Sequence, residues 1–238
     1  MRTVLIVDDN LALAENLAEI IADAGVARPT VAGSGEEALA LVAETRFDVM
    51  VTDMRMPGMN GAELIHRVRA VDPDLPILIM SAFTADQQLA DARYDGVLSV
   101  LSKPTPIPRL LELVARAHRG MVALVEDDVA LADNIVEALR ERGFTTVVAH
   151  SVGEAARLGG APCVAIVVVR VPGGEDGAAI AQVRSRFPAL PVIVVTAYRD
   201  RVPLPRTLPV LEKPVDTGRL LETIETLYAD RRARDRRG

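Results

Sequence analysis

The sequence predicts an α/β protein made of two doubly wound, five-stranded parallel-sheet domains in tandem. Short runs of β-branched and apolar residues alternate with segments of helical periodicity. These runs are apolar on both sides, as are strands of a parallel sheet that helices cover on both faces. The same order of landmarks also occurs twice along the 238 residues. We predict domains over residues 1–120 and 121–228, followed by an arginine-rich tail over 229–238.

The first unit contains five predicted strands, at residues 4–7, 29–32, 48–51, 77–80 and 97–101. Helices are predicted between them. Apolar residues recur at helical spacing after the first and third strands, at Leu13, Leu17, Ile20 and Ile21, and at Leu64, Ile65 and Val68. The second helix begins at a capping box, Ser34 with Glu37. The fourth and fifth helices are predicted over 85–93 and 108–119.

The second unit repeats these landmarks in order. The acidic pair Asp8-Asp9 corresponds to Glu126-Asp127, each directly after an apolar run. A second capping box joins Ser151 and Glu154. The turn at 56–58 corresponds to 171–173, and Lys103-Pro104 corresponds to Lys213-Pro214. These are the only two lysines in the chain, so the repeat explains why both are followed by proline.

Composition narrows the class of protein. Hydrophobic residues make up 50% and charged residues 25%, which is typical of a folded globular chain. The apolar runs are shorter than the roughly 20 residues of a membrane-spanning helix, and no cleavable leader is evident, so we expect no membrane association. A single cysteine, Cys163, favours a cytoplasmic location. The net charge of −6 lies in the first 120 residues, which disfavours nucleic acid as a partner.

Polar side chains stand at the ends of the predicted strands in the first unit. Asp8 and Asp9 follow the first strand, Asp53 the third, Ser81 the fourth and Lys103 the fifth. The carboxyl ends of parallel strands meet at one edge of a sheet, so these groups are expected to converge there. Clustered carboxylates suit a hard cation such as Mg²⁺. The set could hold a phosphoryl group, with Asp53 as nucleophile, Lys103 and the metal neutralising its oxygens, and Ser81 as hydrogen-bond donor.

This arrangement resembles the receiver domain of bacterial two-component response regulators, which has a flavodoxin-like fold. The resemblance covers both units almost end to end. It implies that Asp53 accepts phosphate from a histidine kinase or a histidine phosphotransfer protein. It also implies that Mg²⁺ is bound by Asp8, Asp9, Asp53 and the backbone carbonyl of Arg55. The family usually carries an aromatic residue three positions before the lysine, but Val100 stands there, so we expect the conformational readout to differ.

The second unit departs from this pattern in two places. Val168 stands where Asp53 would be, so no nucleophile is present, although Glu126, Asp127, Thr196 and Lys213 remain. The nearest acids, Glu175 and Asp176, lie past the following turn. The interval from Thr196 to Lys213 is also short and contains Pro203, Pro205 and Pro209, which disfavour a fourth helix. We interpret this unit as a pseudo-receiver, a phosphorylation-independent interaction module.

The leading interpretation is therefore a phosphoacceptor signalling protein that is not an enzyme. Its output is expected to act through contacts with a downstream protein, because no residues remain after the second unit for an output domain. The sequence leaves undecided whether the protein forms a homodimer. One alternative is a phosphorylation-independent scaffold or adaptor. A second is an aspartyl-phosphate hydrolase, which is disfavoured because Arg55 stands where haloacid-dehalogenase-like enzymes have a second acid. Nucleotide or flavin binding is disfavoured because carboxylates, not glycines, follow the first strand.

Overall fold

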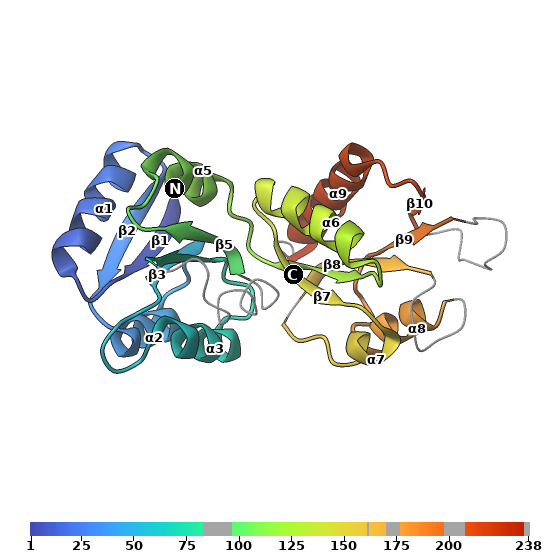
Figure 1. Cartoon of the computed structure of the whole chain (residues 1–238), viewed down its shortest axis with the longest axis horizontal. Coiled ribbons are helices and arrows are strands. Elements are labelled where there is room, and N and C mark those ends of the chain that lie inside the picture. Colours follow the sequence, from blue (N-terminus) through green and yellow to red (C-terminus); the bar gives the residue numbers. More distant parts are fainter. Residues whose placement is uncertain (83–96, 161, 170–176, 198–207, 236–238) are drawn as a thin grey trace. The chain divides into compact units, whose positions relative to one another are not determined.

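The computed structural model describes residues 1–82, 97–160, 162–169, 177–197 and 208–235 (Figure 1). The chain divides into two compact units, one formed by Met1–Gly120 with Arg140–Thr145 and the other by Met121–Leu139 with Thr146–Gly238. Within the described ranges, none of the helices combines the length and the apolar character that a membrane crossing requires.

The first unit is a doubly wound parallel sheet. Its strands are β1 (Arg2–Val7), β2 (Ala27–Ala32), β3 (Val49–Asp53), β4 (Ile77–Ser81) and β5 (Val97–Ser102). They lie in the order β2-β1-β3-β4-β5, and each neighbouring pair is parallel. The described helices are α1 (Leu11–Asp23), α2 (Gly35–Glu44), α3 (Gly61–Val71) and α5 (Ile107–Arg116). The predicted fold class is confirmed for this unit.

Two apolar cores lie on opposite faces of the first sheet. Val4 and Ile6 of β1 belong to the core that α1 and α5 cover, whereas Leu5 and Val7 belong to the core that α2 and α3 cover. Figure 1 shows these two helix pairs on opposite sides of the sheet. Successive side chains of a strand point to opposite faces, so burial on both faces requires a continuous apolar run. That requirement explains why the strands were recognisable in the sequence.

Polar caps fix where the helices begin. Asn10, Ser34 and Asn60 precede α1, α2 and α3, and each side chain accepts a hydrogen bond from the backbone N–H three residues later. Both predicted capping boxes are confirmed as helix starts, at Ser34 and at Ser151. Since α1 begins three residues after Asp8, its cap also fixes the backbone beside the first predicted site residue.

The second unit repeats the architecture. Its strands are β6 (Met121–Val125), β7 (Thr145–Ala149), β8 (Pro162–Val168), β9 (Val192–Thr196) and β10 (Val210–Glu212), in the order β10-β9-β8-β6-β7. The described helices are α6 (Val129–Glu141), α7 (Val152–Ala155), α8 (Ala178–Arg186) and α9 (Thr217–Asp235). The strand order matches that of the first sheet, so the predicted tandem fold is confirmed.

Several predicted boundaries differ from the structure, including two at the ends of helices. The fifth helix ends at Arg116 instead of 119, because Ala117 leaves the helical region (φ −50°, ψ 127°). Residues 229–235 continue α9 instead of forming a separate tail. Several predictions lie outside the described residues: the helix over 85–93, the turn at 171–173, Glu175, Asp176, Pro203 and Pro205. Pro209 is described and directly precedes β10.

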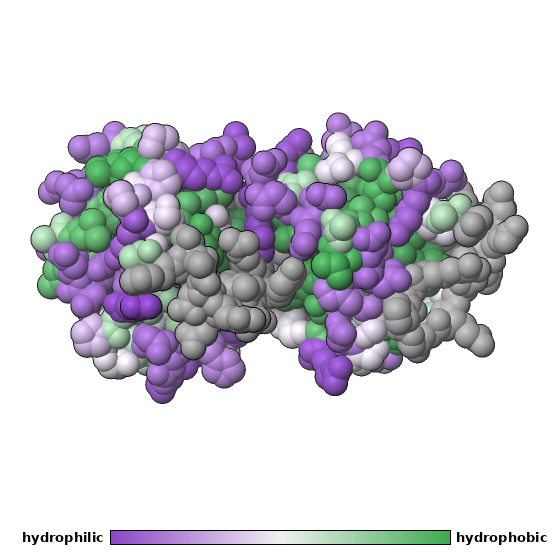
Figure 2. Space-filling model, in the orientation of Figure 1, coloured by the Kyte–Doolittle hydropathy of each residue, from purple (hydrophilic) through white to green (hydrophobic). Residues whose placement is uncertain are grey.

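The outer faces of the helices are largely polar. Figure 2 shows hydrophilic side chains over much of the face in view, with apolar areas between them. In the described part of the chain, the exposed large hydrophobic residues are Met1, Leu11, Val71 and Val129. Leu11 and Val129 are the first residues of α1 and α6, so they occupy the same place in the two repeats.

The start of α3 packs directly on the end of β3 through Gly61. A Cβ at this position would lie 2.5 Å from the carbonyl oxygen of Asp53 and 2.8 Å from Cα of Met54. We therefore predict that Gly61→Ala destabilises the protein by about 1–3 kcal/mol, the usual range for overpacking. Chemical denaturation measures this loss. Gly153→Ala is the matched control, because no atom lies within 4 Å of its added Cβ; equal losses in both variants would contradict the packing argument.

Candidate functional site

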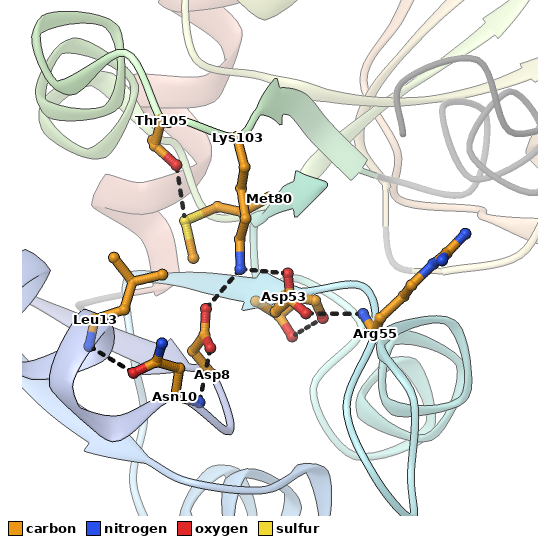
Figure 3. Close-up of polar contacts among 9 residues, drawn as sticks. Asp8, Asn10, Leu13, Asp53, Arg55, Met80, Lys103 and Thr105 are labelled. Atoms are coloured by element: carbon orange, nitrogen blue, oxygen red, sulfur yellow. Dashed lines mark hydrogen bonds and ion pairs between the residues drawn. The ribbon is translucent and has the colours of Figure 1, made fainter. Parts of the chain in front are cut away.

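Two buried carboxylates lie side by side where β1 and β3 end. Asp8 directly follows β1 and Asp53 is the last residue of β3; they are 1% and 7% exposed. The two strands are paired neighbours, with Val7 opposite Thr52. Each carboxylate accepts a backbone hydrogen bond of 2.9 Å from two residues downstream, Asp8 Oδ1 from the N–H of Asn10 and Asp53 Oδ2 from the N–H of Arg55 (Figure 3).

Lys103 joins these carboxylates. Its Nζ donates to Asp8 Oδ2 at 2.9 Å and lies 2.7 Å from Asp53 Oδ1, and Figure 3 shows the side chain pointing between the two acids. Lys103 follows β5, and its backbone N–H donates to the carbonyl of Ser81 at the end of β4. Burial alone would lower the pKa of the Lys103 ammonium, but hydrogen bonds and charge attraction from Asp53 and Asp8 raise the pKa above its ordinary 10.5. The ammonium is therefore a fixed positive charge at this edge.

The remaining predicted residues lie at the same edge with different exposure. Ser81 ends β4 and is buried. Asp9 is exposed beside Asp8. The structure thus brings together Asp8, Asp53 and Lys103, whereas among the described residues no three acidic, histidine or cysteine side chains are gathered closely enough to hold a metal. Asp9 is thus a predicted metal ligand whose carboxylate is not gathered with those of Asp8 and Asp53 in this structure.

The donor set nevertheless fits a hard divalent cation. Asp8 and Asp53 present carboxylate oxygens close enough to share one ammonium, and oxygen ligands are those that Mg²⁺ prefers. Two carboxylates and one ammonium leave a formal charge of −1 in a buried place, before Asp9 at the rim is counted. Such a surplus of negative charge favours a bound cation.

The second unit has an equivalent acid and lysine at the carboxyl ends of its strands, but it lacks the acid that corresponds to Asp53. Glu126 follows β6 with 0% exposure, and its Oε2 accepts a 3.0 Å hydrogen bond from Lys213 Nζ. Its Oε1 accepts from the N–H of Asp128, as Asp8 accepts from Asn10. The N–H of Lys213 donates to the carbonyl of Thr196, which is buried at the end of β9. Asp127 is exposed, like its counterpart Asp9.

Strand register places Val168 where the first sheet has Asp53. Val167 lies opposite Val125, as Thr52 lies opposite Val7, and Val168 lies opposite Val195, as Asp53 lies opposite Met80. Val168 is 5% exposed and apolar. The Glu126–Lys213 pair therefore has no second carboxylate from β8. Burial raises the pKa of Glu126 above its ordinary 4.5, although Lys213 and the Asp128 amide act against this rise.

Sequence reasoning missed the role of Asn10. Its backbone N–H orients Asp8 while its side chain caps α1, so one residue connects the helix start to the site. The signal was present, because asparagine directly before a helical apolar pattern is typical of a cap. The N–H of Arg55 has a similar orienting role on Asp53. Val100 is partly buried and packs against the core beneath α2 and α3.

Comparison with known proteins identifies the family. The family model described as response regulator receiver domain matches residues 4–115. Over 233 residues, the chain is 51% identical to a response regulator receiver protein of Anaeromyxobacter sp. (strain Fw109-5), with 97% of each chain covered. The chain belongs to the response regulator receiver family. Receiver domains of this family typically bind Mg²⁺, and response regulators are generally signalling proteins of two-component systems that interact with histidine kinases and downstream proteins.

The similarity to other response regulators covers about half of this chain. The chain is 36% identical to response regulator protein FleR of Pseudomonas aeruginosa over 129 residues, which are 54% of this chain and 27% of that one. A crystal structure of a response regulator receiver protein from Pseudomonas putida covers 48% of this chain and 94% of its own, with 33% identity and a TM-score of 0.46. The Anaeromyxobacter relative covers 97% of this chain, so its similarity extends through the second unit of this response regulator.

Proposed function

We propose that this response regulator accepts a phosphoryl group on Asp53 from a histidine kinase or a histidine phosphotransfer protein. The convergence of Asp8, Asp53 and Lys103 at one edge of the first sheet carries this proposal. Asp53 is 7% exposed, so an oxygen can reach a donor while most of the side chain is held by the protein. The protein is a stoichiometric acceptor and not a multiple-turnover enzyme.

In the transfer, a carboxylate oxygen of Asp53 attacks the phosphorus of phosphohistidine, a P–O bond forms and the P–N bond breaks. Lys103 already lies 2.7 Å from Asp53 Oδ1, so it is placed to neutralise a phosphoryl oxygen bound there. Ser81, at the end of the adjacent β4, supplies a hydroxyl donor to a second oxygen. The N–H of Arg55 holds Asp53 in orientation throughout. Mg²⁺, held by Asp8, Asp9, Asp53 and the carbonyl of Arg55, would supply further charge neutralisation.

For the second unit we infer a phosphorylation-independent interaction module. Its acid and lysine pair with each other, and Val168 supplies no nucleophile between them. The unit keeps the fold and the edge of a receiver domain while lacking the reacting group. This supports a role in contacts with a downstream protein partner, with phosphorylation confined to the first unit.

The proposal predicts one phosphoryl group on each chain after incubation of the full chain with acetyl phosphate and Mg²⁺. Intact-protein mass spectrometry measures the addition. Removal of divalent cations with EDTA is expected to abolish it, because the buried carboxylates then lack the cation that offsets their charge. A second phosphoryl group would contradict the assignment of the second unit. No addition, under conditions that label a control receiver domain, would favour the phosphorylation-independent scaffold.

A further inference from the structure

The second unit contains a cavity of about 520 Å³ at the edge of its sheet opposite the Glu126–Lys213 pair. Pro162, the first residue of β8, and Pro191, directly before β9, mark this amino-terminal edge. The volume lies in the range of small-molecule sites, roughly 300–1,000 Å³. Much of the lining is apolar and comes from the loop after α8 and from α9, including Phe187, Leu190 and Leu227.

Two arginines from different helices also line this cavity, and each is held at one nitrogen by a backbone carbonyl. Arg186 of α8 donates from Nε to the carbonyl of Leu158 at 2.5 Å, and its guanidinium carbon lies 5.5 Å from the ring centre of Phe187. Arg231 of α9 donates from Nη1 to the carbonyl of Pro162 at 2.7 Å. In the part of the chain that the structure describes, neither Nη group of Arg186 is paired with an acceptor. Its guanidinium fork is therefore available for an anion.

The corresponding loop of the first unit provides an internal comparison. Residues 72–76 and 187–191 share a pattern in which the second, fourth and fifth positions are proline, leucine and proline. Both loops make the same backbone hydrogen bonds: each first residue donates back into the preceding helix, and each last proline accepts from the strand beside it. The two loops are thus equivalent in structure, and their side chains can be compared position by position.

In the first unit this loop takes part in an internal ion pair. Nη2 of Arg119 lies 2.6 Å from both carboxylate oxygens of Asp72, and Nη1 donates to the carbonyl of Phe47. In the second unit a guanidinium again binds the carbonyl at the equivalent position, that of Pro162. However, phenylalanine and alanine, Phe187 and Ala189, stand where the first loop has Asp72 and Asp74. The loop of the second unit therefore has no carboxylate at these two positions.

We propose that this cavity binds a small organic carboxylate with an apolar body. The ligand's carboxylate would accept from the Nη groups of Arg186, while its apolar part lies against Phe187 and Leu190. Asp230 also lines the cavity. Its negative charge repels multiply charged anions, so the geometry points to a ligand with a single carboxylate.

Benzoate is a suitable probe, with benzamide as its neutral counterpart. Both are titrated into the full chain and followed by backbone amide shifts in NMR spectra. We expect benzoate to shift the amides of Ala189 and Leu190 and benzamide to bind at least tenfold more weakly. Arg186→Gln is expected to weaken benzoate binding roughly tenfold or more, as the loss of a charge-assisted hydrogen bond implies. The matched control is Arg184→Gln, an exposed arginine two residues earlier in α8 that does not line the cavity.

A second variant returns an acid to the loop. Ala189 is exposed and lines the cavity, so Ala189→Asp adds a carboxylate without removing core packing. It is expected to weaken benzoate binding at least tenfold by like-charge repulsion. Equal binding of benzoate and benzamide, or benzoate binding that Arg186→Gln leaves unchanged, would overturn the proposal. So would equal binding of benzoate and inorganic phosphate, because the apolar lining would then contribute nothing.

Discussion

Replacing Asp53 by asparagine is expected to reduce phosphorylation of the full chain from one group to none. Asparagine keeps the size of the side chain and an oxygen that can accept from the N–H of Arg55, so the end of β3 should retain its conformation. It removes the negative oxygen that attacks phosphorus. Lys103 keeps Asp8 as an ion-pair partner in this variant. A loss of phosphorylation would therefore be due to the missing nucleophile and not to a disrupted site. Intact mass after treatment with acetyl phosphate and Mg²⁺ measures it.

The matched control for this variant is Asp127→Asn, which removes a carboxylate from the corresponding edge of the second unit. Asp127 is exposed and follows Glu126 there. Since Val168 offers no acceptor at that edge, Asp127→Asn is expected to label like the wild type. Stoichiometric labelling of Asp53→Asn would show that the acceptor is another residue, whereas loss of labelling in Asp127→Asn would show that the second unit takes part in the chemistry.

The strands could be predicted from sequence because both faces of each sheet are buried. The apolar runs identified every strand of the first sheet, but most of the predicted strands were shorter than the observed ones. β1 extends back to Arg2 and β2 back to Ala27, because backbone pairing between Arg2 and Ala27 continues past the apolar part of the pattern. Pro29 lies inside β2 without breaking it, since β2 is an edge strand and one side of its backbone needs no partner.

The candidate site was predictable to the extent that strand ends position it. Asp8 and Lys103 directly follow β1 and β5, and Asp53 is the last residue of β3. Parallel strands bring such positions together at one edge of the sheet. The hydrogen bonds that orient these acids are donated by backbone N–H groups of the following loops. Backbone donors do not depend on the type of side chain, so they produce no recognisable pattern in the sequence. The pair between Arg119 and Asp72 is likewise formed by residues far apart in the chain. Contacts of this kind depend on loop geometry and could not be derived from periodicity.

Replacing Lys213 by methionine is expected to destabilise the second unit by about 3 kcal/mol, at the low end for breaking a buried ion pair because Lys213 keeps 29% exposure. The change leaves the carboxylate of Glu126, which is fully buried, without its cation. Burial already holds the pKa of Glu126 above 4.5 in the wild type, against the opposing effect of Lys213. Losing Lys213 raises that pKa further. Urea denaturation followed by circular dichroism measures the free energy of unfolding.

The same variant should show a characteristic dependence on pH. An acid whose pKa is higher in the folded than in the unfolded protein binds more protons when folded, so stability falls as the pH rises above the unfolded value and through the folded one. The loss of stability in Lys213→Met should therefore be large near neutral pH and shrink in mildly acidic buffer, where Glu126 is protonated.

Adding Glu126→Gln to Lys213→Met should recover more than half of the lost stability, because the amide oxygen still accepts from the N–H of Asp128. Arg219→Met removes an exposed charge and should cost less than about 0.5 kcal/mol. A deficit that is independent of pH, or that Glu126→Gln does not reduce, would mean that Lys213 stabilises the unit by packing rather than by charge.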